Sequence, residues 1–141
     1  MATKYANPRD KLVLIADDDA GIRQLLEVTF QEEGFRIEMA ANGPDTIKKI
    51  QKSAPDVILL DIMMPGFGGF EILRKLRDGA ASDTPVILLT ARFMDEATQQ
   101  MIRSEANVKE FVFKPINLHL IRSLISRLLN TPPPKTGERL V

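Results

Sequence analysis

The chain has 141 residues, of which 44% are hydrophobic and 27% are charged, a composition typical of one globular domain with a substantial core. Lysine and arginine together number 19 and so do aspartate and glutamate, so the overall charge gives no reason to expect nucleic acid or an anionic membrane as the main partner. The lack of cysteine excludes a disulfide framework and a cysteine zinc site, and the lack of a signal-peptide core or of an apolar run of about 20 residues favours a cytoplasmic protein.

The first half of the chain contains two apolar runs, each followed by a segment of helical periodicity. Residues 11–17 are rich in leucine and β-branched side chains and predict a strand, and the apolar spacing over 22–30 then predicts a helix that Gly34 closes. Residues 35–41 alternate more strongly and predict a second strand. An Asn-Gly-Pro turn leads from this strand into a short amphipathic helix over 44–53.

The second half of the chain repeats this alternation and ends in a proline-rich segment. Apolar runs predict strands at 56–61, 85–91 and 110–113, and helical spacing predicts helices at 70–76, 94–105 and 118–129. The final sequence TPPPKTGERLV cannot continue a helix. We therefore expect one folded domain over 10–130, an N-terminal extension over 1–9, and a flexible tail or the stub of a linker over 131–141.

Five strands that alternate with five helices predict an α/β fold, a three-layer, doubly wound domain around a parallel five-stranded sheet. The runs at 56–61 and 85–91 are apolar throughout, as expected where helices cover both faces of a sheet. In such a sheet all strand C-termini lie at one edge, and ligands bind in the crevice there. Four polar residues end or follow predicted strands and should converge at that edge: Asp17, Asp61, Thr90 and Lys114.

Asp17 opens a run of three aspartates, Asp17-Asp18-Asp19, whose carboxylates repel one another unless a cation offsets their charge. Clustered carboxylate oxygens select a hard cation, and Mg²⁺ is the expected ion. A carboxylate beside Mg²⁺ can attack a phosphoryl group, while an ammonium and a hydroxyl group stabilise the transferred oxygens. We therefore expect aspartyl phosphate chemistry at this edge, with Lys114 and Thr90 as the stabilising residues.

Each of these residues also has an ordinary explanation when it is taken alone. Asp61 fits a turn, Thr90 fits an ordinary strand position, and Lys114 fits a solvated surface. Asp19 fits the N-cap of the first helix, and we expect it to have that role. The joint arrival of the other residues at one edge favours a site. His119 lies in the polar arc of the last helix and is expected at the surface.

Four segments, in this order and spacing, resemble the receiver domain of two-component response regulators over about residues 10–130: LIADDD, NGPDTIKKIQKSAPDVILLDIMMPGFGG, TPVILLTA and FVFKP. The resemblance implies the flavodoxin-like fold of the chemotaxis response regulators, with strand order 2-1-3-4-5. It also implies a domain that accepts a phosphoryl group from a sensor histidine kinase or a histidine phosphotransfer protein. Such a domain catalyses its own phosphorylation and autodephosphorylation, and it is not an enzyme that turns over an outside substrate.

The resemblance assigns the phosphoryl group and the metal to particular residues. Asp61 is implied as the phosphoacceptor. Asp17 and Asp18 are implied as the acid pair that serves Mg²⁺ or Mn²⁺, with Asp18 the more direct ligand. Met63 is implied to lend its backbone carbonyl to the same ion, which Asp61 also contacts.

The resemblance also implies a phosphoryl-binding residue and a switch. Lys114 is implied to bind the phosphoryl group and to precede a cis peptide bond to Pro115. Thr90 and Phe111 stand where the family has its switch hydroxyl and switch aromatic, so that movement of Thr90 toward the phosphoryl group lets Phe111 rotate inward. Arg92 is long and cationic, and it is a candidate for tuning the access of water to the phosphoaspartate.

Partners are expected at the surface formed by 94–105, 110–113 and 118–129, which changes shape when the switch moves. That surface is implied to control a downstream protein or an output domain, or to form a homodimer. The charge pattern of the winged-helix transcription-factor branch is absent around Lys109–Glu110, which disfavours the dimer of that branch. No direct contact with nucleic acid or with a membrane is expected within this chain.

Three rival functions are disfavoured by the residues themselves. A haloacid-dehalogenase-type phosphatase needs a second aspartate two residues after its nucleophile, where this chain has Met63. A nucleotide-binding flavodoxin-like protein needs a glycine-rich loop after its first strand, where this chain has DDDAGIR. A degenerate receiver that acts only as a binding module is disfavoured by the complete set of aspartate, threonine and lysine residues.

Overall fold

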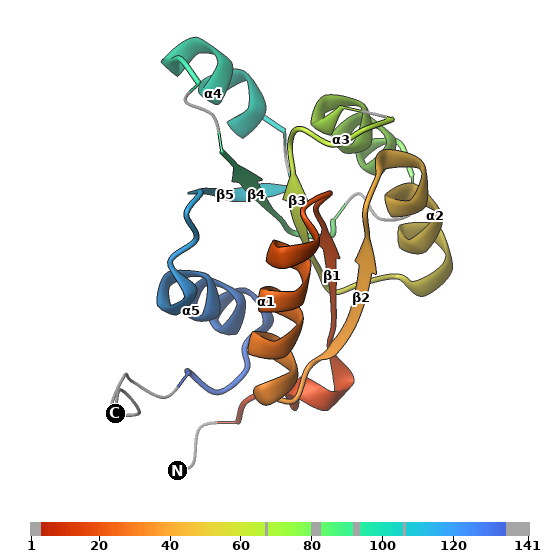
Figure 1. Ribbon diagram of the computed structural model, residues 1–141. Coiled ribbons are helices and arrows are strands. Elements are labelled where there is room, and N and C mark those ends of the chain that lie inside the picture. Colours follow the sequence, from red (N-terminus) through yellow and green to blue (C-terminus); the bar gives the residue numbers. More distant parts are fainter. Residues whose placement is uncertain (1–3, 67, 80–82, 92–93, 106, 135–141) are drawn as a thin grey trace.

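Helices and strands alternate along the computed structural model, which describes residues 4–66, 68–79, 83–91, 94–105 and 107–134 (Figure 1). The strands are β1 (Leu12–Ala16), β2 (Arg36–Ala40), β3 (Val57–Asp61), β4 (Val86–Thr90) and β5 (Val108–Phe113). The helices are α1 (Ala20–Glu32), α2 (Gly43–Ser53), α3 (Gly69–Arg77), α4 (Glu96–Arg103) and α5 (Leu118–Leu129). A turn of 3₁₀ helix, η1 (Pro8–Asp10), precedes β1 and is not predicted by the sequence pattern. Among the helices in these ranges, none is long and apolar enough to cross a membrane.

The five strands form one parallel sheet in the order β2-β1-β3-β4-β5, which confirms the predicted fold and strand order. Every residue of the three inner strands β1, β3 and β4 is buried. The edge strands β2 and β5 mix buried and exposed residues. The alternation in the sequence of β2 therefore reflects its position at the edge, where one side of the strand meets solvent.

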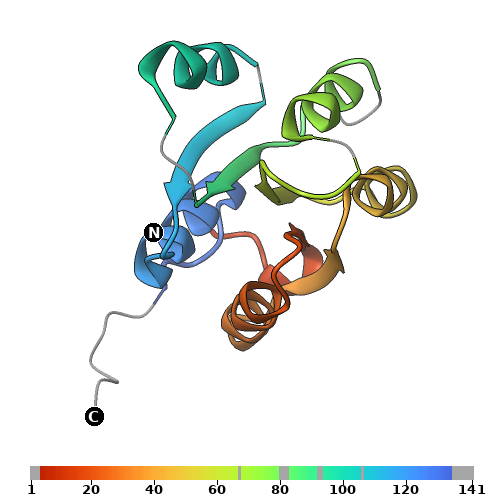
Figure 2. The ribbon, with the colours of Figure 1, turned by 45° about the horizontal axis from the view of Figure 1, so that its top comes forward.

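Helices cover both faces of the sheet and make the fold three layers deep (Figure 2). Because successive side chains of a strand point to opposite faces, Leu14 joins the core beneath α2, α3 and α4, whereas Ile15 joins the core beneath α1 and α5. Each fully buried aliphatic side chain of these two cores contributes about 1.5–3 kcal/mol relative to its exposure to water. The sheet is thus a rigid platform whose C-terminal edge remains open between the helices.

α1 begins and packs largely as the sequence predicts. Asp19 is the N-cap, as expected, and its side chain accepts hydrogen bonds from two backbone N–H groups of the first turn. Leu26 and Phe30 are fully buried against the sheet. Leu25, which the predicted apolar face includes, is instead 43% exposed, because Leu26 and Phe30 occupy the stripe of the helix that faces the sheet.

α4 has a smaller buried face than predicted. Ile102 is its buried residue, whereas Ala97 and Met101 of the predicted apolar face are exposed. The helix packs mainly on the edge strand β5 rather than over the middle of the sheet, and little of its surface is buried. In α5 most of the predicted face is buried, Leu118 and Leu128 are half-buried, and His119 is exposed as expected.

The two ends of the domain are tied to each other. The backbone N–H of Ala6 donates to the carbonyl of Asn130 at 2.7 Å. Beyond that point Thr131 is only 2% exposed, and the Ser126 hydroxyl donates to its carbonyl at 2.8 Å. The first residues of the predicted tail over 131–141 therefore pack against α5, and the residues from 135 onward lie outside the described part of the chain.

Candidate metal centre

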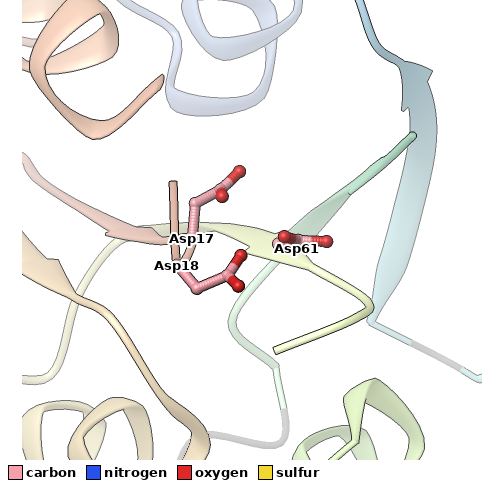
Figure 3. Close-up of side chains that lie close together, drawn as sticks. All are labelled: Asp17, Asp18 and Asp61. Atoms are coloured by element: carbon pink, nitrogen blue, oxygen red, sulfur yellow. The ribbon is translucent and has the colours of Figure 1, made fainter. Parts of the chain in front are cut away.

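Three carboxylates meet at the C-terminal edge of the sheet. Asp17 directly follows β1 and Asp61 ends β3, and these two strands are neighbours in the sheet. Oxygen atoms of Asp17, Asp18 and Asp61 lie within 4.8 Å of one another (Figure 3). Asp17 and Asp61 are 0% and 4% exposed, whereas Asp18 is exposed. The structure thus brings together the acids that the strand endings placed at one edge.

Lys114 joins two of these acids. It follows β5, and its Nζ lies 2.8 Å from Asp17 Oδ2 and 3.5 Å from Asp61 Oδ2. Its backbone N–H donates to the carbonyl of Thr90 at 2.8 Å, which extends the β4–β5 ladder to the rim of the site. The peptide bond from Lys114 to Pro115 is cis. One ammonium group, reaching across the end of β4, therefore contacts the ends of both β1 and β3.

The electrostatics of the site are governed by burial and by these neighbours. The pKa of Asp61 is raised from 3.8 to about 6, mainly because the carboxyl group is buried. The hydrogen bond from the Met63 backbone N–H opposes this shift and lowers the pKa. The Asp17 carboxylate raises this pKa further, and the Lys114 ammonium lowers it. Burial alone would lower the pKa of Lys114, but the carboxylates of Asp17 and Asp61 outweigh that effect and raise it. At neutral pH Asp61 is therefore ionised and Lys114 is protonated.

The donor set fits a divalent cation. The three clustered carboxylates face one ammonium, which leaves two negative charges without a positive partner among them. Two of these carboxylates are buried, where uncompensated charge is expensive. Carboxylate oxygens at this spacing are the ligands that Mg²⁺ and Mn²⁺ prefer. The residues present are thus suited to holding such an ion.

The turn after β1 is held in place by contacts that the sequence pattern does not reveal. The backbone N–H of Asp19 donates to Asp17 Oδ1 at 2.9 Å. Arg23 Nη1 donates to the carbonyl of Asp17 at 2.7 Å. Sequence reasoning missed Arg23, and the only available signal was its place four residues after the Asp19 cap, one turn into α1. These two contacts hold the backbone from Asp17 to Asp19 in place and so orient the side chains of Asp17 and Asp18.

The loop between β3 and α3 packs tightly beside Asp61 and forms one wall of the site. The backbone N–H of Met63 donates to Asp61 Oδ1 at 3.0 Å, and the Met63 side chain is 55% exposed at the mouth of the site. A Cβ on Gly69 would come within 2.6 Å of Ile62 Cγ1, so this glycine lets α3 start directly against the end of β3. The loop walls a hollow of about 380 Å³ that Asp18, Asp61, Met63 and Lys114 help to line.

The predicted switch residues lie on the two strands beside the site. Thr90 ends β4 and is fully buried. Phe111 lies on β5, is 6% exposed, and belongs to the core that contains α2, α3 and α4. Arg92, the predicted tuning residue, lies outside the described residues.

The comparison with known families decides the class of the protein. A family model for the response regulator receiver domain matches residues 13–126. This chain belongs to the response regulator receiver family. The receiver is 37% identical over 128 residues to the transcriptional regulatory protein AfsQ1 of Streptomyces coelicolor. The aligned residues cover 91% of this chain and 52% of that protein. It is 31% identical to the response regulator MprA of Mycobacterium tuberculosis over 91% of this chain and 55% of that protein.

Solved structures agree with this assignment. The receiver superimposes on the chemotaxis response regulator CheY4 of Vibrio cholerae with a TM-score of 0.76 and 31% identity, covering 84% of this chain and 98% of that chain. It superimposes on the receiver domain of a Francisella response regulator with a TM-score of 0.75 and 30% identity, covering 84% and 96% of the two chains. The receiver spans about half the length of the curated relatives it matches.

Proposed function

We propose that this receiver accepts a phosphoryl group on Asp61, in a reaction that depends on Mg²⁺ or Mn²⁺. The observation that carries the proposal is the position of Lys114 Nζ, 2.8 Å from Asp17 and 3.5 Å from Asp61 at the open edge of the sheet. A buried carboxylate beside both an ammonium and two further acids is arranged for metal-assisted phosphoryl transfer rather than for structure alone. Membership of the receiver family supports the same chemistry.

The ion would be held by Asp17, Asp18 and Asp61, with the backbone carbonyl of Met63 as a further oxygen ligand. All four are hard oxygen donors, and the exposure of Asp18 leaves room for the water molecules that Mg²⁺ normally keeps. A bound ion supplies positive charge beside the incoming phosphoryl oxygens. The protein contributes the orientation of the donors, through the contacts that hold the turn after β1.

Asp61 is the nucleophile. Its pKa of about 6 leaves it ionised at neutral pH, so a carboxylate oxygen can attack phosphorus without prior removal of a proton. The new oxygen–phosphorus bond forms as the bond from phosphorus to the donor breaks, and the donor leaves with that electron pair. Lys114 offsets the charge of one phosphoryl oxygen, and the Thr90 hydroxyl donates to another when it turns toward the site.

The donor is proposed to be a sensor histidine kinase or a histidine phosphotransfer protein, and the reaction is one on the receiver's own carboxylate rather than turnover of an outside substrate. Phosphorylation adds about −1.5 to −2 charges to this edge of the sheet. Phe111 already lies inward in this structure, at 6% exposed, so movement of Thr90 toward the phosphoryl group would favour that orientation and alter the surface of α4, β5 and α5. The small buried face of α4 supports this, because a helix with few buried apolar contacts can shift at low cost.

The altered surface is proposed to control a downstream protein, an output domain or a second copy of the receiver, in the cytoplasm. The relatives are about twice as long as this chain, and one of them is named a transcriptional regulatory protein, which supports an output partner.

The test uses acetyl phosphate as a small phosphodonor with millimolar Mg²⁺ and the intact mass of the protein as the readout. We expect the wild-type protein to gain one phosphoryl group and Asp61→Asn to gain none. Asp83→Asn, which changes an exposed aspartate away from the site, serves as the matched control and should gain the group normally. If the wild-type protein gains no group under these conditions, the proposed phosphorylation is refuted, and the receiver would act only as a binding module.

A further inference from the structure

Arg103, in the last turn of α4, places its guanidinium group over the ring of Phe111. The guanidinium carbon of Arg103 lies 4.6 Å from the centroid of the Phe111 ring, within the range of a cation–π contact. Arg103 Nη1 also lies 3.8 Å from Glu110 Oε1, on the residue next to that ring. On β5 the Phe111 ring stacks with Phe113, at 6.4 Å between centroids and 15° between planes. Arg103 is therefore anchored to two consecutive residues of the edge strand.

This contact adds to the packing that attaches α4 to the sheet. Ile102 is the buried residue of the helix, so apolar burial holds α4 at one position only. A second ionic contact, from Arg77 to Glu105 at 3.8 Å, lies just past the same end of the helix. Both of these ion pairs thus lie at the C-terminal end of α4, and the N-terminal end is capped by Asp95, whose side chain accepts from the backbone N–H of Thr98.

We infer that Arg103 is a positioning residue that favours the buried orientation of Phe111, and that it thereby sets how readily this receiver accepts its phosphoryl group. The cation–π contact forms with the ring in its buried orientation, in which Phe111 is 6% exposed. The inference rests on the proposed function, in which an inward Phe111 accompanies phosphorylation. A contact that stabilises one of two conformations also promotes any modification that prefers that conformation. Stabilising the inward Phe111 should therefore promote phosphorylation of Asp61.

The test is a cycle of four proteins: wild type, Arg103→Gln, Phe111→Leu and the double variant. Phosphoryl uptake from acetyl phosphate is followed by intact mass at fixed Mg²⁺. We expect Arg103→Gln to slow uptake about two- to fivefold, the value of a partly exposed cation–π contact. In the Phe111→Leu background the same change should have no effect, because the aromatic face is gone. Glu110→Gln should slow uptake less than Arg103→Gln, since it leaves the cation–π contact in place.

One rival explanation is that Arg103 simply attracts the anionic phosphodonor. It predicts equal slowing by Arg103→Gln in both backgrounds and full recovery in Arg103→Lys, and that pattern would overturn the inference. Hydrogen exchange without any phosphodonor gives an independent readout, in which Arg103→Gln should speed exchange of the α4 amides while the thermal midpoint stays close to that of the wild type. Unchanged exchange in α4 would refute the role of Arg103 even if Asp61 is phosphorylated normally, whereas failure of wild-type uptake would refute the proposed function itself.

Discussion

Replacing Asp61 by asparagine should stabilise the metal-free receiver at neutral and alkaline pH. The carboxyl group is 4% exposed and close to the carboxylate of Asp17, so its ionised form is disfavoured in the folded state. Its pKa is about 6 in the folded protein, against an ordinary value of 3.8. Asparagine has a similar shape and carries no charge. The same group that the reaction needs as a nucleophile therefore lowers the stability of the fold.

The magnitude follows from the difference between the two pKa values. That difference corresponds to about 3 kcal/mol of destabilisation when the group is ionised in both states. Because the folded-state pKa is the higher one, the penalty is absent below about pH 3, grows as the pH rises toward about 6, and is complete above about 7. The stability advantage of Asp61→Asn should therefore increase by about 2 kcal/mol between about pH 4.5 and about pH 8.

Urea unfolding followed by circular dichroism, in the presence of EDTA, measures this directly. The free energy of unfolding of wild type and Asp61→Asn would be compared across that pH range, with Asp83→Asn as the control for loss of an exposed charge. An advantage that is the same at every pH, or that shrinks as the pH rises, would refute the assignment of Asp61 as a buried carboxylate with a raised pKa. Added Mg²⁺ should reduce the advantage, because the ion stabilises the carboxylate form.

Three further predictions concern the metal, the helix cap and the loop. Millimolar Mg²⁺ should raise the thermal midpoint of the wild type in differential scanning fluorimetry and leave that of Asp18→Ala nearly unchanged; equal shifts would remove Asp18 from the donor set. Asp19→Ala should lower the free energy of unfolding by about 1 kcal/mol, since it deletes the cap of α1, while phosphoryl uptake stays at the wild-type rate; loss of uptake would show that Asp19 belongs to the site. Gly69→Ala should destabilise the domain by about 1–3 kcal/mol in urea unfolding, because the new Cβ would meet Ile62 at 2.6 Å; an unchanged midpoint would mean that the loop relaxes freely.

The three-layer arrangement was predictable because the inner strands carry continuous apolar runs and the edge strand β2 alternates, whereas the strand order was implied by the family resemblance. Periodicity gave less information at the other edge. β5 begins at Val108, two residues before its predicted start, because the exposed Lys109 interrupts the apolar pattern where one side of an edge strand meets solvent. Periodicity also overestimated the buried face of α4, since it reports which residues share a side of a helix but not how much of that side lies over the sheet.

The convergence of the site was predictable from the chain positions at which strands end. Asp17, Asp61 and Lys114 each end or follow a strand, and the C-terminal ends of parallel strands lie at one edge of the sheet. The roles expected of these residues came from the family resemblance rather than from spacing. The contrast between buried Asp17 and exposed Asp18 depends on the turn after β1, which a strand-ending rule does not specify. The contacts of Arg23 and Arg103 were not predictable, because long side chains that meet a backbone carbonyl or an aromatic ring leave no periodic signal.

Locating the phosphoryl group on the chain tests whether Asp61 is the phosphoacceptor of a metal-dependent site. The receiver would be treated with acetyl phosphate with and without Mg²⁺, and any acyl phosphate would be reduced with borohydride, which converts a phosphorylated aspartate to homoserine. Tandem mass spectrometry of the digest then reads the modified position. We expect homoserine at position 61 in the sample with Mg²⁺ and almost none in the sample without it. Homoserine at Asp17 or Asp18, or equal yields with and without the ion, would contradict this expectation.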